Sequence, residues 1–508
     1  MSITRRRFVR QAASAIALPL ALSKTGLTAQ EPARASGPRP RQPNLLLLWT
    51  DQHRGDVMPY AGNEALQAPN LRALGDRSFC FQRAYCTQPV CTPSRGSILT
   101  GMWPHHHGAT DNNIPMRADA RTIAEHLPQD YVTGYFGKWH LGNEVNPQHG
   151  FRHWRSIEDD YRKYYTDTAA RMRTSTYHRF LVERGFPPDV NPEGGLPAIF
   201  SRTMAAGLAE PYTKVAYLAN EAEAFLRERR RDSQPFVLSV NTLEPHPPTY
   251  GPLNESHRPG SLPESEAFGR PMSDGASLHH RRRAENLRRS GYKNHAIESK
   301  ADWRRLRANY YGLVKMVDNA YGRVLRALEE SGQADSTIVV YTSDHGEMLG
   351  DHCLMGKGVF FEPSIRIPLM VHVPWLSRRR VSFNGPFSQI DLVPTLLDLM
   401  GVAPVAPLDG RSHANALRQP ESWQDEDVAV IWNESDDERE DGRCLVGADG
   451  WKLILYRGDG AELYDLNSDP AELRNLGGEA SQKDRISRMG EKIRAWQQRQ
   501  GDSVPLLG

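Results

Sequence analysis

The stretch Asn44-Leu45-Leu46-Leu47-Leu48-Trp49-Thr50 decides the fold of this chain. It carries no charged residue, and large apolar side chains follow one another from Leu45 to Trp49. Because successive side chains of a β-strand point to opposite faces, a continuous apolar run indicates a strand that is covered on both faces. We therefore predict a buried parallel strand in a sheet with helices on both sides.

Three more apolar runs are predicted to be strands of the same sheet, at residues 131–136, 235–241 and 337–342. Helical patterns separate these runs. The clearest helix follows Asp302, keeps its apolar residues on one side as far as Leu328, and meets a stop at Gly332. Strands that alternate with amphipathic helices favour an α/β fold, here a large and mostly parallel sheet flanked by helices.

The pattern changes beyond about residue 425. Shorter strands are predicted at residues 428–432, 444–447, 451–456 and 462–466, followed by a helix over about 482–499. Asp449-Gly450 is a hairpin signal between the second and third of these strands. We predict a catalytic α/β domain over residues 36–424 and a smaller antiparallel subdomain over residues 425–508, preceded by an export signal in residues 1–35.

Ionisable side chains follow each of the four long strands within a few residues. In open α/β sheets, ligands bind outside the carboxyl ends of the strands, so side chains that are distant in the sequence meet there. One acidic residue after a strand would carry little information, whereas four such ends are typical of an active site. The residues that we expect to converge are Asp51, Lys138, His140, His246, Asp344 and His345.

The segment Cys91-Thr92-Pro93-Ser94-Arg95 is predicted to be a loop that enters a helix. Thr92 can act as the N-cap, and Pro93 then occupies the first helical position. Cys91 would lie at a helix N-terminus, where the dipole favours negative charge. Arg95 adds a fixed cation with a fork of donors that suits a tetrahedral oxyanion. These features indicate chemistry on a sulfate or phosphate ester.

The same pentapeptide, Cys-x-Pro-Ser-Arg, resembles the signature of the type I sulfatases of the alkaline phosphatase superfamily. Residues 96–101 resemble the extended signature, and Ser343-Asp344-His345-Gly346-Glu347 resembles the metal motif. The resemblance spans residues 44 to about 476. It implies that a modifying enzyme converts Cys91 into formylglycine, an aldehyde whose hydrate is the nucleophile.

The resemblance also implies a role for each matching residue. One divalent cation, Ca²⁺ or alternatively Mg²⁺, would be held by Asp51, Gln52, Asp344 and His345 together with the modified Cys91; hard oxygen donors suit both ions. Arg95 and Lys138 would hold the nucleophile and its charge. Lys357 and His246 would contact the sulfate, with His246 as the general acid, and His140 would deprotonate the remaining hydroxyl.

Gln52 departs from the family pattern, because many sulfatases have a second aspartate there. The loss of one negative charge also occurs in relatives that cleave phosphonate or phosphate esters. The expected activity is hydrolysis of a sulfate monoester, a small molecule or more specifically a sulfated carbohydrate. A phosphonate monoester or phosphodiester hydrolase, and a non-catalytic protein that binds sulfated glycans, stay open as alternatives.

Composition and the N-terminus indicate where the protein works. The formal net charge of +2, from 63 basic and 61 acidic residues, gives no electrostatic basis for nucleic acid binding. Thr4-Arg5-Arg6-Arg7-Phe8 resembles a twin-arginine export motif, and a short apolar region follows it. We expect a periplasmic or secreted protein without a membrane anchor. The sequence leaves open the oligomeric state and whether the other four cysteines pair.

Two polar stretches, residues 159–207 and 251–297, are predicted to be surface insertions that shape the substrate pocket. The aromatic side chains Trp154, Tyr161, Tyr164 and Tyr165 could stack on a sugar, but packing is the more common role of such residues. The adjacent histidines His105, His106 and His107 are expected to be structural or to support the site's residues from behind, rather than to bind metal, because histidine often satisfies carbonyl groups near a helix end. The role of His107 stays open between these two.

Overall fold

The structure is a computed structural model that describes residues 38–230, 234–273, 275–293, 296–434 and 437–506. The proposed export signal lies outside the described residues. Residues 34–508 form one compact unit. No helix among the described residues is long and apolar enough to cross a membrane.

A nine-stranded sheet forms the centre of this unit, with β4-β3-β5-β1-β6-β8-β2-β7 as its strand order and β9 paired to β2. The stretch from β4 to β6 is parallel throughout, and β8 runs antiparallel to both β6 and β2. The strands are β1 Asn44–Asp51, β2 Phe79–Tyr85, β3 Val132–Gly137, β4 His153–Ser156, β5 Phe236–Pro245, β6 Thr337–Ser343, β7 Arg366–Ile367, β8 Leu369–His372 and β9 Val381–Ser388. The predicted fold class, a mostly parallel sheet flanked by helices, is confirmed.

Strand β1 lies between β5 and β6, and its alternating side chains enter two different cores. Leu45, Leu47 and Trp49 belong to one apolar cluster. Leu46 and Leu48 belong to the other. All eight residues of β1 are buried. This two-sided burial is the physical reason for the uninterrupted apolar run.

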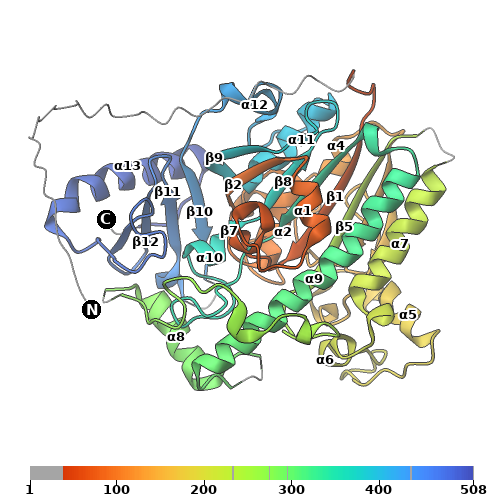
Figure 1. The fold of residues 1–508 in the computed structure, drawn as a ribbon, viewed down its shortest axis with the longest axis horizontal. Helices are drawn as coiled ribbons and strands as arrows, with labels where there is room; N and C mark the ends of the chain where they lie inside the picture. Colours follow the sequence, from red (N-terminus) through yellow and green to blue (C-terminus); the bar gives the residue numbers. More distant parts are fainter. Residues whose placement is uncertain (1–37, 231–233, 274, 294–295, 435–436, 507–508) are drawn as a thin grey trace, which may run out of the picture. The chain divides into compact units, whose positions relative to one another are not determined.

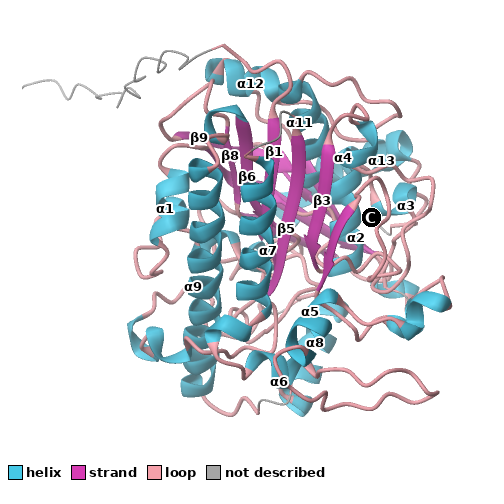
Figure 2. Cartoon of the chain, turned by 90° about the vertical axis from the view of Figure 1, so that its right-hand side faces the viewer, coloured by secondary structure: helices cyan, strands magenta, loops and turns pink. Residues whose placement is uncertain are grey.

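Helices cover both faces of the sheet. Helices α7 and α9 lie side by side across one face and contact β5 (Figures 1 and 2). On the opposite side, helix α11 contacts both α2 and α4. The bounds are α1 Pro69–Gly75, α2 Cys91–Thr100, α3 Pro104–His107, α4 Ile123–His126, α5 Thr176–Val182, α6 Arg202–Ala206, α7 Lys214–Arg229, α8 Leu278–Ser290, α9 Lys300–Glu330, α10 Glu362–Ile365, α11 Leu392–Met400, α12 Ala414–Arg418 and α13 Lys483–Gln500.

The C-terminal part forms a separate antiparallel sheet in the order β10-β11-β12-β13. Its strands are β10 Val428–Trp432, β11 Gly442–Val446, β12 Trp451–Tyr456 and β13 Ala461–Asp465. The predicted hairpin joins β11 to β12, with Gly450 at a φ of 84°. Helix α13 packs on this sheet and reaches the main domain, where Trp496 meets Trp103 edge to face at 4.9 Å between ring centroids.

Two local predictions differ from the structure. Thr92 is not the N-cap, because α2 begins at Cys91 after the extended residue Val90. The Thr92 hydroxyl instead donates to the carbonyl oxygen of His140 at 2.9 Å. The stretch 251–297 is largely surface, as expected, but it also contains helix α8, whose His279 and His280 are buried. Both differences arise from contacts with segments that are distant in the sequence.

Candidate active site

The carboxyl ends of four neighbouring strands and the start of helix α2 meet at one point. Asp51 ends β1 and Gln52 follows it, Lys138 and His140 follow β3, His246 follows β5, and Asp344 and His345 follow β6. All of these side chains are buried, with at most 9% of their surface exposed. The convergence that the strand-end pattern predicts is therefore present.

Cys91 lies at the centre of this cluster. Its Sγ atom is 2.8 Å from Nζ of Lys357, 3.4 Å from Nε2 of His345, 3.5 Å from Oδ1 of Asp51 and 3.6 Å from Nζ of Lys138. Burial and Asp51 raise the pKa of the thiol, but Lys138, Lys357 and His345 outweigh them and hold its pKa below the usual value. An anion at this position is thus stabilised by its surroundings.

Cations hold the two aspartates of the cluster. Nζ of Lys138 lies 2.6 Å from Oδ2 of Asp51. Nη1 of Arg95 lies 2.9 Å from Oδ2 of Asp344 and 3.5 Å from Oδ2 of Asp51. The guanidinium of Arg95 also lies 4.2 Å from the ring centroid of Trp49. Arg95 therefore bridges the carboxylates, and its hydrogen bonds go to them and to neighbouring carbonyl groups rather than to Cys91.

The donor set of this cluster fits a divalent cation. One ligand atom from each of Asp51, Cys91, Asp344 and His345 lies within 4.8 Å of the others. Nδ1 of His345 bonds to the carbonyl oxygen of Gly346 at 2.9 Å, so that Nε2 faces the cluster. Two buried carboxylates and an imidazole supply charge and lone pairs at one point, as an oxygen-preferring metal requires.

Gln52 contributes to the cluster through its amide group. Its Oε1 accepts from Nζ of Lys357 at 2.9 Å, while its Nε2 donates to Tyr292 at 3.1 Å and to the carboxylate of Glu347. The residue has a φ of 71°, which is uncommon outside glycine. The amide oxygen is therefore held toward the cationic side of the site.

The two histidines of the predicted acid–base chemistry have fixed orientations. His140 stacks on Tyr161 at 3.9 Å between centroids, and its Nε2 bonds to Oδ1 of Asn113 at 3.0 Å. Its Nδ1 is buried and has no hydrogen-bond partner among the described residues. His246 bonds through Nδ1 to the carbonyl oxygen of Pro247 at 2.7 Å. Burial, chiefly, lowers the pKa of both rings, so both are neutral in the absence of substrate.

A cavity of about 350 Å³ opens onto Cys91. Gln52, His140, His246 and Lys357, all of them candidate site residues, line it. The two insertions also reach it, through Tyr161 and Arg202 from the first stretch and through α8 and its following turn from the second. The lining residues that sequence reasoning missed are Asn112, Asn113, Arg202, Arg283, Tyr292, Lys293, Met355 and Gly356. Only Met355 and Gly356 carried a signal, because they lie beside Lys357 in the sequence.

The remaining candidate residues have structural roles. His105 bonds to the carbonyl oxygen of Gln500 near the end of α13 at 2.8 Å, and His106 pairs with Asp409 at 2.7 Å. His107 bonds to the carbonyl oxygen of Pro93 in α2 at 3.1 Å.

Of the aromatic side chains, Tyr161 faces the cavity, Trp154 and Tyr165 are buried, and Tyr164 is 37% exposed. All five cysteines are free.

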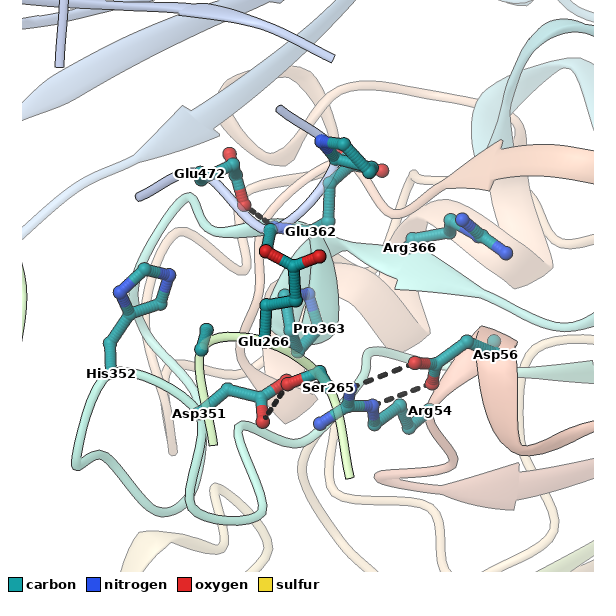
Figure 3. A pocket seen from close by; sticks show the side chains of 14 residues that line it. Arg54, Asp56, Ser265, Glu266, Asp351, His352, Glu362, Pro363, Arg366 and Glu472 are labelled. Carbon is teal, nitrogen blue, oxygen red and sulfur yellow. Dashed lines mark hydrogen bonds and ion pairs between the residues drawn. The ribbon is translucent and has the colours of Figure 1, made fainter. Parts of the chain in front are cut away.

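A second hollow, shown in Figure 3, offers no comparable chemistry. Its buried Arg54 is paired with Asp56 at 2.5 Å and with Asp351 at 2.7 Å. Ser265 donates to Asp351 at 2.6 Å. The charges of Arg54, Asp56 and Asp351 therefore satisfy one another, and none of the predicted site residues lines this hollow.

Comparison with known proteins gives two family matches. A family model described as Sulfatase matches residues 43–402. A second model, described as N-sulphoglucosamine sulphohydrolase, C-terminal, matches residues 350–499. The first match includes every residue that lines the Cys91 cavity.

Individual relatives are similar along most of their length. The chain is 29% identical to an arylsulfatase of Clostridium perfringens, covering 88% of this chain and 92% of the relative. It is 25% identical to an N-acetylglucosamine-6-O-sulfatase of Bacteroides thetaiotaomicron, covering 97% and 92%. A solved phosphonate monoester hydrolase of Agrobacterium radiobacter shares the fold, with a TM-score of 0.72 at 24% identity over 90% of this chain and 96% of that one.

Proposed function

The chain belongs to the sulfatase family and is a sulfuric ester hydrolase, and we propose that it acts on a sulfated carbohydrate with formylglycine at position 91 as its nucleophile. The observation that carries this proposal is the environment of Cys91. Two lysines and a histidine surround its Sγ atom, which stands here for the oxygens of a formylglycine hydrate. The same charges that lower the pKa of the thiol would stabilise an oxyanion at that position.

We propose Asp51, Gln52, Asp344 and His345, together with the modified residue 91, as the holders of one divalent cation. The family implies such a metal, and the buried Asp51, Cys91, Asp344 and His345 suit it. Oxygen donors dominate the set, which favours Ca²⁺ and leaves Mg²⁺ as the alternative. When bound, the cation would offset the two carboxylates and withdraw electron density from the sulfate oxygens.

The chain's own residues can then move the required protons. Lys138 and Lys357 hold the hydroxyl at position 91 as an oxyanion, its proton having passed to solvent. The oxyanion attacks sulfur while the bond from sulfur to the alcohol oxygen breaks. Nε2 of His246 gives a proton to that oxygen, because Nδ1 is already committed to the carbonyl of Pro247. The anionic substrate favours the protonated ring that this step needs.

His140 completes the proposed cycle. Asn113 offers a carbonyl oxygen to Nε2 of His140, so the proton resides there and Nδ1 is left as the acceptor. Nδ1 takes the proton of the second hydroxyl at position 91. The carbon–oxygen bond to the sulfate then breaks, which releases sulfate and restores the aldehyde. Water rehydrates the aldehyde, and both histidines return to their starting states by exchange with solvent.

The substrate and location are part of the same proposal. The name of the N-acetylglucosamine-6-O-sulfatase relative supports a sulfated sugar. The motif at residues 4–8 supports twin-arginine export to the periplasm or the medium, after folding and modification in the cytoplasm. Phosphonate monoester hydrolysis is the second candidate, because Gln52 takes the place of an aspartate and lowers the negative charge of the site.

The proposal is tested on protein made together with a formylglycine-generating enzyme. Peptide mass spectrometry should find the aldehyde at position 91, and metal analysis should find about one divalent ion per chain. Sulfated saccharides should be hydrolysed faster than a matched phosphonate monoester. C91A should keep the fold and lose nearly all turnover, while C353A, which changes a free cysteine outside the cavity, should retain it.

Each part of the proposal has its own contrary result. Active protein whose residue 91 is still cysteine would refute the nucleophile. Faster phosphonate turnover would favour the second candidate. Specific glycan binding without turnover by fully modified protein would make the chain a binding protein.

A further inference from the structure

The wall of the Cys91 cavity is positively charged. Four of its lining residues are lysine or arginine, namely Arg202, Arg283, Lys293 and Lys357, and none is aspartate or glutamate. Two of these four side chains already contact polar or acidic partners. Lys357 contacts Cys91 and Gln52, and Arg202 is paired with Glu158 and, at 2.9 Å, with Asp160. Arg283 and Lys293 remain.

Arg283 is a half-buried cation that bonds only neutral acceptors among the described residues. Its Nη2 donates to the carbonyl oxygen of Lys357 at 2.9 Å and its Nε to that of Gly358 at 3.3 Å. Its guanidinium lies 5.4 Å from the ring centroid of Trp432. Burial lowers its pKa. The carboxylates of Glu434 and Glu440 oppose this shift. Because the hydrogen bonds of Arg283 go to backbone carbonyl groups, its guanidinium keeps capacity to bind an anion.

Lys293 lies on the turn that follows α8 and lines the same cavity. Its side chain is exposed, and it forms no ion pair with an acidic side chain in the described part of the chain. Its charge is therefore available to a ligand. The neighbouring Tyr292, whose hydroxyl accepts a hydrogen bond from Gln52 at 3.1 Å, also lines the cavity.

We propose that Arg283 and Lys293 form a second anion subsite, which selects substrates that carry another anionic group, a carboxylate or a second sulfate, beside the scissile sulfate ester. This inference rests on the proposed sulfatase function and narrows its substrate class. In the proposed mechanism, Lys357 and Lys138 serve the reacting centre at Cys91 and so do not count toward a second anion. A substrate with one negative charge would leave Lys293 without a bound anion and Arg283 hydrogen-bonded only to carbonyl groups, in a partly desolvated site.

The test uses three sulfate monoesters built on one sugar: a neutral one, one with an added carboxylate and one with a second sulfate. The quantity compared is the ratio of kcat/KM for each dianionic ester to that for the neutral ester. K293Q should lower this ratio about fivefold, as expected for an exposed charge pair. K293Q/R283Q should lower it tenfold or more, because a half-buried guanidinium binds an oxyanion more strongly. R283K, which keeps the charge, should retain most of the selectivity.

R281Q is the matched control. Arg281 lies on the same helix, carries the same charge and does not line the cavity, so its loss should leave the ratio unchanged. An unchanged ratio in K293Q and in the double variant would overturn the subsite while leaving the sulfatase assignment intact. Absence of turnover of all three esters by fully modified wild-type protein would instead count against the proposed carbohydrate substrate. If the variants lower the kcat/KM ratio of only one dianionic ester, that ester identifies the anion that the subsite binds, a carboxylate or a sulfate.

Discussion

Glu144 is a buried residue that holds the His140 loop in place. Its Oε1 accepts from the backbone N–H of Trp139 at 2.8 Å, and its Oε2 accepts from that of His140 at 2.6 Å. His140 needs this support because its φ of 58° is unfavourable for a side chain with a Cβ atom. A single carboxylate therefore fixes the backbone from which the proposed base projects.

We predict that E144Q will lower kcat about tenfold or more, because its amide nitrogen cannot accept one of these two N–H groups and the His140 loop will shift. The free energy of unfolding should fall by about 1–3 kcal/mol. E472Q is the control for loss of a buried carboxylate, since Glu472 is equally buried and accepts the backbone N–H of Glu362 at 2.7 Å. Its other partner is Lys452 at 2.6 Å, so it does not hold the His140 loop. Loss of stability without a larger loss of kcat than in E472Q would contradict a positioning role.

Glu144 also predicts a pH dependence of stability. Burial raises its pKa from 4.5 to about 7, so the folded state binds this proton more tightly than the unfolded state does. The contribution of Glu144 to the free energy of unfolding is therefore fully present below pH 4.5. It is lost as the pH rises through about 7, and its size is on the order of 3 kcal/mol. Urea unfolding at several pH values should show the stability of wild type falling relative to E144Q across this interval. A difference that does not vary with pH would contradict the assignment.

At the scale of elements, helix α8 holds the turn that carries Lys357. His279 bonds through Nε2 to the carbonyl oxygen of Gly358 at 2.6 Å and through Nδ1 to Glu440 at 2.6 Å. Arg283, one turn further along α8, donates to Lys357 and Gly358. The helix thus connects the C-terminal subdomain, through Glu440, with Lys357, the lysine proposed to act at position 91. An insertion that looks like surface in the sequence is part of the active-site scaffold.

We predict that G358A will impair this scaffold. A Cβ atom at Gly358 would clash with Nη2 of Arg283, so the Arg283 side chain would have to move away from the carbonyl groups of Lys357 and Gly358 that it holds. Activity should fall roughly 10- to 100-fold. G185A is a matched control, because Gly185 has the same φ of 83° but nothing lies within 4 Å of its added Cβ atom. Both variants should lose about 1–2 kcal/mol of stability from the left-handed backbone. Equal activity in the two variants would refute the scaffold role.

At the scale of the whole molecule, the two sheets share one apolar core. Val430 and Trp432 of β10 and Tyr456 of β12 belong to the same cluster as Leu45 and Trp49 of β1. The backbone joins them as well, because the N–H of Ile431 donates to the carbonyl oxygen of Thr87 at 2.8 Å. The segment 425–508 therefore completes the core of the larger sheet in addition to forming its own.

We predict that a chain ending at residue 424 will not fold. Removing the C-terminal strands uncovers several large apolar side chains, each worth about 1.5–3 kcal/mol, against a typical net stability of about 5–15 kcal/mol. The truncated chain should be insoluble or lack a cooperative unfolding transition. Deletion of residues 1–33, which lie outside the unit formed by residues 34–508, should leave the cooperative transition and activity intact. A soluble, cooperatively folding 34–424 fragment would contradict the shared core.

The sequence by itself determined the central strand, the fold class and which strand-end residues lie together at the candidate site. The run from Leu45 to Trp49 reports burial on both faces, and the carboxyl ends of parallel strands lie at one edge, so residues such as Asp51 and Lys138 could be placed together in advance. These inferences succeed because local pattern sets secondary structure and sheet geometry sets where strands end.

Only the tertiary structure decided which side chains from loops and insertions reach that edge. Asn113, Arg283 and Lys293 carry no periodic signal, and their places depend on long-range contacts such as the packing of α8 against the Lys357 turn. Thr92 shows the same effect, because its hydroxyl bonds to the distant carbonyl of His140 rather than capping its own helix. A side chain's partner is set by the sum of such contacts across the folded chain, which neighbouring residues in the sequence do not specify.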